Sequence, residues 1–231
     1  MSRGKKYKEN ISKYDSSKEY SLDDALGLLS EFAKSNFDES VDLSVNLGVD
    51  PRHADQLIRG AVSLPNGTGK KVKAIVVTKD DEKAKKCIDS GAIEAGSKDL
   101  LTKIEKGWLD FDVMIASPDM MSPLGKLGKL LGPRGLMPNP KVGTVTNEVE
   151  KCLSEVLAGK VEYRVDKNGI INVGVGKVSF DQDKIKENIL TCMGAILRAK
   201  PASVKGTYFE KLTLSSTMGP GIKILKSDFT N

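Results

Sequence analysis

The chain has 231 residues, 39% of them hydrophobic, which is enough for one large or two small packed domains. Its 36 basic and 31 acidic residues give a net charge of +5, a mild excess that favours an anionic partner without identifying one. No run approaches the roughly 20 apolar residues of a transmembrane helix, and the basic start of the chain lacks the apolar continuation of a secretory signal.

The three cysteines of the chain indicate the redox compartment in which it works. Cys87, Cys152 and Cys192 are far apart in the sequence and have neither pairing nor metal-ligand spacing. This pattern is typical of reduced thiols in a cytoplasm, at core positions of helices. We therefore expect no metal and no cofactor.

The first third of the chain predicts one helix and two strands. Residues 1–19 are polar and charged, and we expect them to be loosely ordered until a partner binds. Ser21 predicts the N-cap of a helix, and residues 65–69 form a flexible break that we interpret as a hinge. The elements expected between them are a helix over 22–33, with Ala33 as its last apolar residue, and strands over 41–47 and 61–64.

The pattern changes after this break. Short continuous apolar segments alternate with helical ones, which is typical of an α/β unit with a parallel sheet. The expected strands cover 72–77, 92–95 and 111–116, and the expected helices cover 80–89, a segment from 98, a segment within 118–131, and 145–157.

From residue 160 the sequence returns to strict alternation. Strands over 161–165 and 170–178 flank an Asn168-Gly169 pair, which predicts a β-hairpin with a tight turn. A helix over 180–197 and a strand over 207–216 complete the expected elements.

The simplest architecture that fits these elements is discontinuous. Residues 1–67 and 160–231 would form an α+β outer domain built from both chain ends. Residues 68–159 would form an inserted three-layer α/β domain of the Rossmann-like type.

The run from Gly125 to Pro140 is basic, rich in Gly and Pro, and free of Asp and Glu. Lys126, Lys129 and Arg134 have no counter-charge within it, and its glycines allow close backbone approach. Such a run suits contact with a polyanion, most commonly a folded nucleic acid. The alternative is an ordinary solvated loop with scattered lysines.

Two features imitate catalytic motifs without completing them. The Gly-Thr-Gly-Lys segment at 67–70 resembles the end of a phosphate-binding loop, but a Walker loop requires Gly at Leu64 and Ser or Thr at Lys71. His53 is the single histidine and has no nucleophile motif beside it. We therefore expect no enzyme, and a nucleotide-using enzyme is the least favoured alternative.

Four segments together resemble one protein family. The run 125–140 is joined, in the family's order, by matches over 37–50, 59–70 and 215–221. The chain is thereby similar to the universal side-stalk protein of the large ribosomal subunit, the ribosomal protein L-one family, in its bacterial form. The resemblance implies the discontinuous fold described above. It also implies that the protein binds RNA and does not catalyse a reaction.

The resemblance also implies which residues contact RNA. An exposed aromatic ring can pack on a base or ribose, and a Thr hydroxyl can meet a 2′-OH or phosphate. Taken alone, an aromatic residue after a helix could equally close the core, and a Thr-Met-Gly segment could be an ordinary strand end. The implied RNA contacts are Phe37, Ser40, Arg164, Lys167, Thr217, Met218 and Gly219. Accessory electrostatic contacts from the inserted domain are expected at Lys126, Lys129, Arg134 and Lys141.

The partners implied by the resemblance are all RNA. They are a folded stem-junction of large-subunit rRNA, where the protein forms the mobile side stalk, and the tRNA that leaves the exit site. In bacteria the resemblance adds repression of the protein's own operon through an mRNA leader that imitates the rRNA site. We expect a cytoplasmic protein of the ribosome with no membrane partner, monomeric away from it. A non-ribosomal RNA chaperone of the same fold is the alternative.

Overall fold

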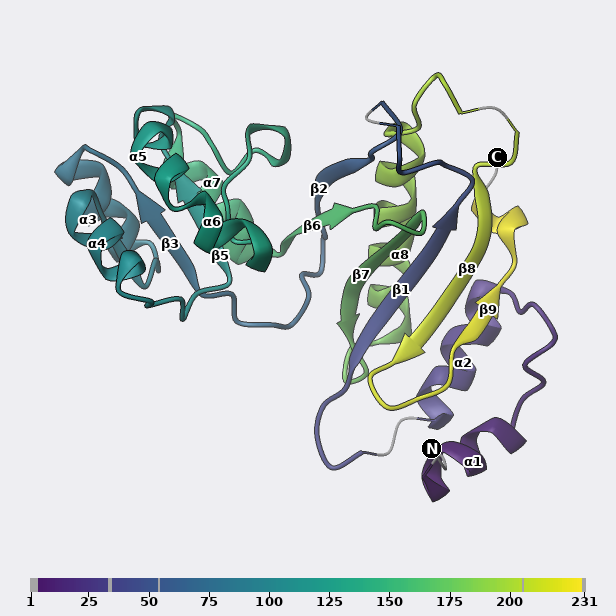
Figure 1. Cartoon of the computed structure of the whole chain (residues 1–231). Coiled ribbons are helices and arrows are strands. Elements are labelled where there is room, and N and C mark those ends of the chain that lie inside the picture. Colours follow the sequence, from purple (N-terminus) through teal and green to yellow (C-terminus); the bar gives the residue numbers. More distant parts are fainter. Residues whose placement is uncertain (1–3, 33–34, 54, 205, 230–231) are drawn as a thin grey trace. The chain divides into compact units, whose positions relative to one another are not determined.

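The computed structural model describes residues 4–32, 35–53, 55–204 and 206–229 (Figure 1). The chain divides into two compact units, Met1–Gly69 with Val161–Asn231, and Lys70–Lys160. Each unit has apolar clusters of its own. The protein is therefore a mixed α/β protein with several sheets, in agreement with the class expected from the alternation of helices and strands.

A four-stranded antiparallel sheet forms the centre of the first unit, in the order β7-β1-β8-β9. In β1, buried residues alternate with exposed or half-buried ones. The sheet therefore has one face toward the core and one toward solvent. Its strands are β1 (Ser40–Leu47), β7 (Ile170–Lys177), β8 (Phe209–Ser216) and β9 (Ile222–Ile224).

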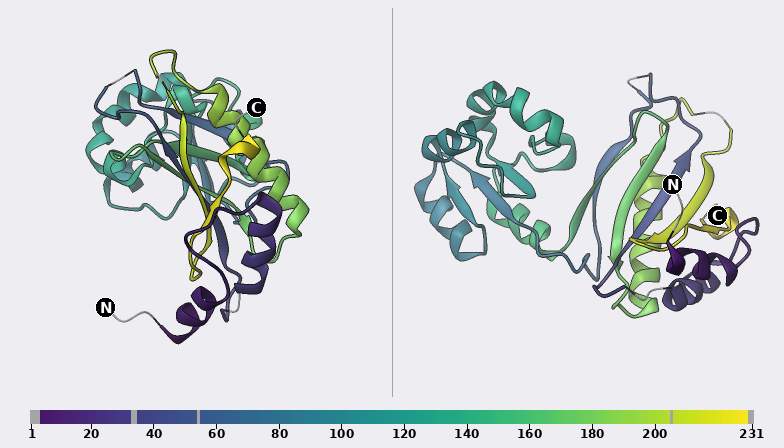
Figure 2. Two further views of the ribbon diagram at one scale, coloured as in Figure 1. Left: turned by 90° about the vertical axis from the view of Figure 1, so that its right-hand side faces the viewer. Right: turned by 60° about the horizontal axis from the view of Figure 1, so that its bottom comes forward.

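Helices α2 (Leu22–Phe32) and α8 (Gln182–Arg198) cover the buried face of this sheet, and Figure 2 shows the same arrangement from two further directions. The predicted N-cap of α2 is confirmed, because the Asp24 N–H donates to Ser21 Oγ at 3.2 Å. Ala33, expected as the last apolar residue of this helix, lies outside the described residues.

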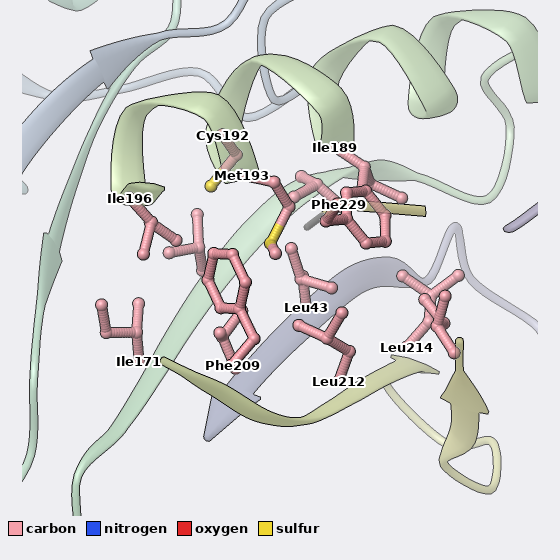
Figure 3. Close-up of a cluster of buried hydrophobic side chains, with 14 of the residues drawn as sticks. Leu43, Ile171, Ile189, Cys192, Met193, Ile196, Phe209, Leu212, Leu214 and Phe229 are labelled. Atoms are coloured by element: carbon pink, nitrogen blue, oxygen red, sulfur yellow. The ribbon is translucent and has the colours of Figure 1, made fainter. Parts of the chain in front are cut away.

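Apolar side chains fill the space between α8 and the sheet (Figure 3). Ile189, Met193 and Ile196 come from one side of α8 and meet Phe209 and Leu212 of β8. The three helix residues recur at intervals of four and three, which places them on one face. All five are 2% exposed or less, so this layer of the unit is closed to water.

The N-terminal segment differs from the expectation of loose order. It contains α1 (Lys5–Ser12), formed largely from residues with good helix propensity such as lysine and glutamate. The segment is held to the unit by contacts with Phe32: Asn10 Nδ2 donates to its carbonyl oxygen at 3.1 Å, and the Tyr14 ring lies 5.2 Å from its ring.

The predicted hairpin around Asn168-Gly169 is correct for its turn but wrong for its pairing. Gly169 has a φ of +80°, as a tight turn requires. β6 (Lys160–Arg164), however, pairs with β2 (Arg59–Ser63) in a separate two-stranded sheet. Val165 forms an isolated bridge to Ile171 of the strand that follows the turn. Alternation marks a strand, but it does not identify the strand's neighbour.

The second unit contains a parallel three-stranded sheet in the order β4-β3-β5. All residues of β3 are buried, and they alternate between two apolar clusters, one on each face. Helices α3 and α7 contribute to one cluster, and α4, α5 and α6 to the other. The strands are β3 (Ala74–Val77), β4 (Glu94–Gly96) and β5 (Val113–Ala116). The helices are α3 (Asp81–Asp89), α4 (Lys98–Glu105), α5 (Met121–Lys126), α6 (Gly128–Leu131) and α7 (Val149–Ala158).

The basic run 125–140 is helical in its first half. Leu127 and Leu131 are buried, because the segment presents an apolar side to the core of the second unit. From Gly132 the run continues in turns, and Gly135 has a φ of +72°. The 3₁₀ turns of the whole chain are η1 (Pro118–Met120), η2 (Gly132–Arg134), η3 (Pro140–Val142) and η4 (Lys226–Phe229).

Candidate nucleic-acid interface

The structure brings together five of the seven residues expected to contact RNA. The start of β1 lies beside the end of β8, where the Thr217 N–H donates to the carbonyl oxygen of Ser40 at 3.1 Å. The Ser40 N–H in turn donates to Thr217 Oγ1 at 3.0 Å. We call Phe37, Ser40, Thr217, Met218 and Gly219 the strand-end patch.

Two large apolar side chains of the strand-end patch face solvent. Phe37 is 55% exposed and Met218 is 61% exposed, the two highest values among the exposed large hydrophobic residues. The alternative that Phe37 closes the core is therefore wrong. Exposed apolar side chains on adjoining segments are typical of a surface that a partner covers.

A buried carboxylate links the two segments that carry these side chains. Glu39 is only 3% exposed, and its Oε2 accepts a hydrogen bond from the Met218 N–H at 3.0 Å. Burial opposes its ionisation, yet hydrogen bonds from Ser216, Ser35 and Met218 hold the pKa of Glu39 below its usual value. Glu39 therefore stays charged, and its hydrogen bond with the Met218 N–H connects the start of β1 to the segment that follows β8.

The carboxylate of Asp38 connects the same segment to Ser179 and Lys177. It accepts hydrogen bonds from the Ser179 N–H at 3.2 Å and the Ser179 hydroxyl at 2.9 Å, and it lies 3.5 Å from Lys177 Nζ. These hydrogen bonds, chiefly that of the hydroxyl, lower the pKa of Asp38. Asp38 and Glu39 therefore hold in place the two residues that directly follow Phe37.

Neither carboxylate was assigned a role from the sequence, although both belong to the matched segment 37–50. The available signal was the acidic pair Asp38-Glu39 immediately before a strand that begins a half-buried sheet. What the sequence could not supply was the partner of each carboxylate, since Ser179 and Met218 are distant in the chain.

The packing of the turn after β8 favours glycine at position 219. A Cβ built on it would lie 2.5 Å from Ser216 Oγ, so a side chain would displace the residue that binds Glu39. The turn is closed by the Gly219 N–H, which donates to the Ser216 carbonyl oxygen at 3.2 Å.

Arg164 and Lys167, which are implied as RNA contacts together with these five residues, lie outside the strand-end patch. They precede β7, whose first residue Ile170 faces Asn46 on β1. Asn46 is six residues along β1 from Ser40, which corresponds to about 20 Å. The two basic side chains are exposed and border a cavity of about 440 Å³ at that opposite end of the sheet.

The solvent face of the sheet joins these two ends. Ser44 Oγ donates to Asn172 Oδ1 at 2.7 Å across β1 and β7, and burial raises the pKa of the half-buried Asp42 carboxyl on the same face. Short hydroxyl, amide and carboxyl groups of this kind can hydrogen-bond ribose 2′-OH groups. The side chains on this face include Asp42, Ser44, Asn46, Asn172, Thr213 and Ser215.

The four accessory cations of the second unit lie on its surface. All four side chains are exposed, on α5, α6 and the turns that follow. Ion pairs of this unit use other lysines, such as Lys70 with Asp112 and Lys73 with Asp110, each at 2.6 Å. The cations in question are Lys126, Lys129, Arg134 and Lys141.

The described residues offer no metal-binding cluster of three or more His, Cys, Asp and Glu side chains. The three cysteines occupy buried core positions in α3, α7 and α8, as expected. Within the described ranges, none of the helices has the length and apolar character needed to cross a bilayer.

The model of the ribosomal protein L1p/L10e family matches residues 29–220. The matched range contains the whole strand-end patch, Arg164, Lys167 and the four accessory cations.

Proposed function

The chain belongs to the ribosomal protein L1p/L10e family, a family of structural proteins that bind RNA of the large ribosomal subunit, and we propose that it forms the mobile side stalk of that subunit. In this proposal the first unit is the RNA-binding domain and holds a folded stem-junction of large-subunit rRNA. The strand-end patch is the observation that carries it, because Phe37 and Met218 are exposed on segments tied down by buried hydrogen bonds.

The chemistry of the strand-end patch suits RNA. The Phe37 ring can stack on a base or ribose, and the Met218 thioether can lie against a sugar. Thr217 Oγ1 already accepts one hydrogen bond from the protein, which fixes its orientation and leaves a second acceptor position for a 2′-OH. Since the donors and acceptors are held in place before binding, little ordering entropy is lost.

We propose that the RNA continues from the strand-end patch along the solvent face of the sheet toward Arg164 and Lys167. The distance of about 20 Å along β1 is within the span of two turns of an RNA stem. Asp42 can accept a hydrogen bond from a 2′-OH or a base amino group on this path, and the two basic residues can contact phosphates.

The exit-site tRNA and the operon mRNA leader are proposed partners of the same protein. An mRNA leader that imitates the rRNA site would use the strand-end patch, since the two RNAs then present the same groups. The accessory cations of the second unit are proposed to contact rRNA or tRNA phosphates. We place the protein on cytoplasmic ribosomes.

The direct test is equilibrium binding of the full chain to a large-subunit rRNA fragment that contains the stalk stem-junction, with a scrambled fragment as control. Specific binding should exceed non-specific binding by at least about 10³-fold. Equal affinities for the two fragments would contradict the proposal. Co-sedimentation with intact ribosomes at moderate salt then separates a ribosomal protein from an RNA chaperone.

Replacing the four accessory cations with alanine should weaken RNA binding modestly and reduce its salt dependence. Each lost phosphate contact lowers the slope of log K against log salt by about 0.7–0.9. A matched variant in which Lys83, Lys85, Lys86 and Lys151 are replaced has the same change of charge on the helices α3 and α7 of that unit. Equal slopes for the two variants would show that the accessory cations have no particular role.

A further inference from the structure

A cavity lies between α1 and the strand-end patch. Its volume is about 490 Å³, within the range of sites that hold small ligands. Lys6, Tyr7 and Lys13 line it from the N-terminal segment, and Phe32 and Met218 line it from the body of the unit. The cavity thus shares Met218 with the surface proposed to bind RNA.

Contacts with Phe32 and Gly221 attach α1 and the residues that follow it beside this cavity. All eight residues of α1 are described, and none of them is buried. Asn10 Nδ2 binds the Phe32 carbonyl oxygen, and the neighbouring Tyr14 packs on the Phe32 ring. These contacts attach the helix at the edge of the cavity and leave most of its polar surface facing solvent.

The charge of this segment is strongly positive. Residues 5–13 contain four lysines and one glutamate, and Glu9 lies 3.5 Å from Lys13. A surface of this sign next to the strand-end patch complements a polyanion that covers Phe37 and Met218. It also lies outside the family match, which begins at residue 29.

Resting on the proposed function, we propose that this cavity receives one unstacked nucleobase of the RNA bound at the strand-end patch, and that Lys6 and Lys13 contact the phosphates beside that base. The Tyr7 ring and the Met218 thioether match the flat apolar surface of a base, and the buried Phe32 forms part of the wall behind them. Lys6 and Lys13 on the same wall match the phosphates beside the base. The lining therefore offers groups for both parts of a nucleotide, the base and its phosphate.

The buried carboxylate at the cavity wall does not compete for the base. Glu39 accepts hydrogen bonds from Ser35, Ser216 and Met218, which occupy its oxygens. Its role is to position the Met218 segment, and the nucleobase is held by stacking and packing. Stacking accepts any base, so the cavity should select an unpaired nucleotide by shape more than by sequence.

The lysines of the N-terminal segment provide a matched test of the phosphate contacts. Lys6 and Lys13 line the cavity, whereas Lys5 and Lys8 are exposed on α1 and do not line it. Binding of the full chain to the stalk rRNA fragment should lose about 1.4–1.8 of its salt slope in the K6Q/K13Q variant. The K5Q/K8Q variant, with the same change of charge, should keep the slope of the wild type.

Substitutions of Tyr7 test whether a nucleobase stacks in the cavity. Tyr7→Ala should weaken binding about 5- to 150-fold, the loss of one stacked base, while Tyr7→Phe should bind like wild type. The fragment is also prepared with an abasic residue at each unpaired position in turn. One of these should weaken the wild type and leave the Tyr7→Ala variant unchanged, which identifies the base.

The outcomes separate this inference from the proposed function. If the wild type does not distinguish the stalk fragment from the scrambled one, the proposed function fails. If it does, and Phe37→Ala weakens binding while Tyr7→Ala and both lysine pairs have equal small effects, only the nucleobase site is overturned. Circular dichroism of each variant confirms that α1 is retained.

Discussion

Replacing both Phe37 and Met218 with alanine should weaken binding of the stalk rRNA fragment by about two to four orders of magnitude. Loss of one stacked base costs about 1–3 kcal/mol, and loss of a buried methionine contact about 1.5–3 kcal/mol. Both side chains face solvent in the protein, so the melting temperature should stay within about 2 °C of the wild type. Isothermal titration or a filter-binding assay measures the affinity.

The chain offers a matched control for this double variant. Leu190 and Leu197 are also large exposed apolar residues of the first unit, 46% and 36% exposed, but they lie on α8, which covers the opposite face of the sheet. Their replacement by alanine should leave RNA affinity unchanged. If the two double variants behave alike, the strand-end patch is not the RNA site.

Replacing Glu39 with glutamine should reduce both stability and RNA affinity. The amide keeps the size of the side chain but turns one acceptor into a donor that faces the donors of Ser35, Ser216 and Met218. We expect a loss of about 1–3 kcal/mol in the free energy of unfolding and about tenfold in RNA affinity at temperatures where the variant is folded. Denaturant unfolding and RNA titration measure the two effects.

The dependence on pH gives this prediction an independent readout. Because the pKa of Glu39 is lowered on folding, its ionisation stabilises the protein above the usual glutamate pKa of about 4.3, and this stabilisation is lost as the pH falls through the lowered value. The stability difference between the wild type and the Glu39→Gln variant should therefore shrink in acid. A difference that stays constant with pH would contradict a charged Glu39.

Elements with strong periodicity could be predicted from the sequence. β1 alternates polar and apolar residues because one face of its sheet is solvated, and β3 is apolar throughout because both of its faces are covered. The helix α1 and the short strand β9 were not predicted. The first has no buried face to create a period, and the second has only three residues.

The site could be predicted only in part. Phe37 and the Thr-Met-Gly segment were identified through their resemblance to a family, and the structure explains why they meet: β1 and β8 are neighbours. Arg164 and Lys167 lie outside the strand-end patch, because they precede the start of β7, which pairs with Asn46 at the other end of β1. Glu39 was missed because its role depends on hydrogen-bond partners that are distant in the sequence and are brought close only by folding.

The pairing of β1 with β8 also has a consequence for biosynthesis. Ser40 and Thr217 are 177 positions apart, so the strand-end patch does not exist until the ribosome has made β8 and the chain has closed the sheet. A growing chain exposes Phe37 early, yet it lacks the hydrogen-bonded turn that completes the surface. Under the proposed function, RNA binding at this patch therefore requires the complete sheet, and fragments that stop before β8 should not compete with the full chain for rRNA or for a messenger that imitates rRNA.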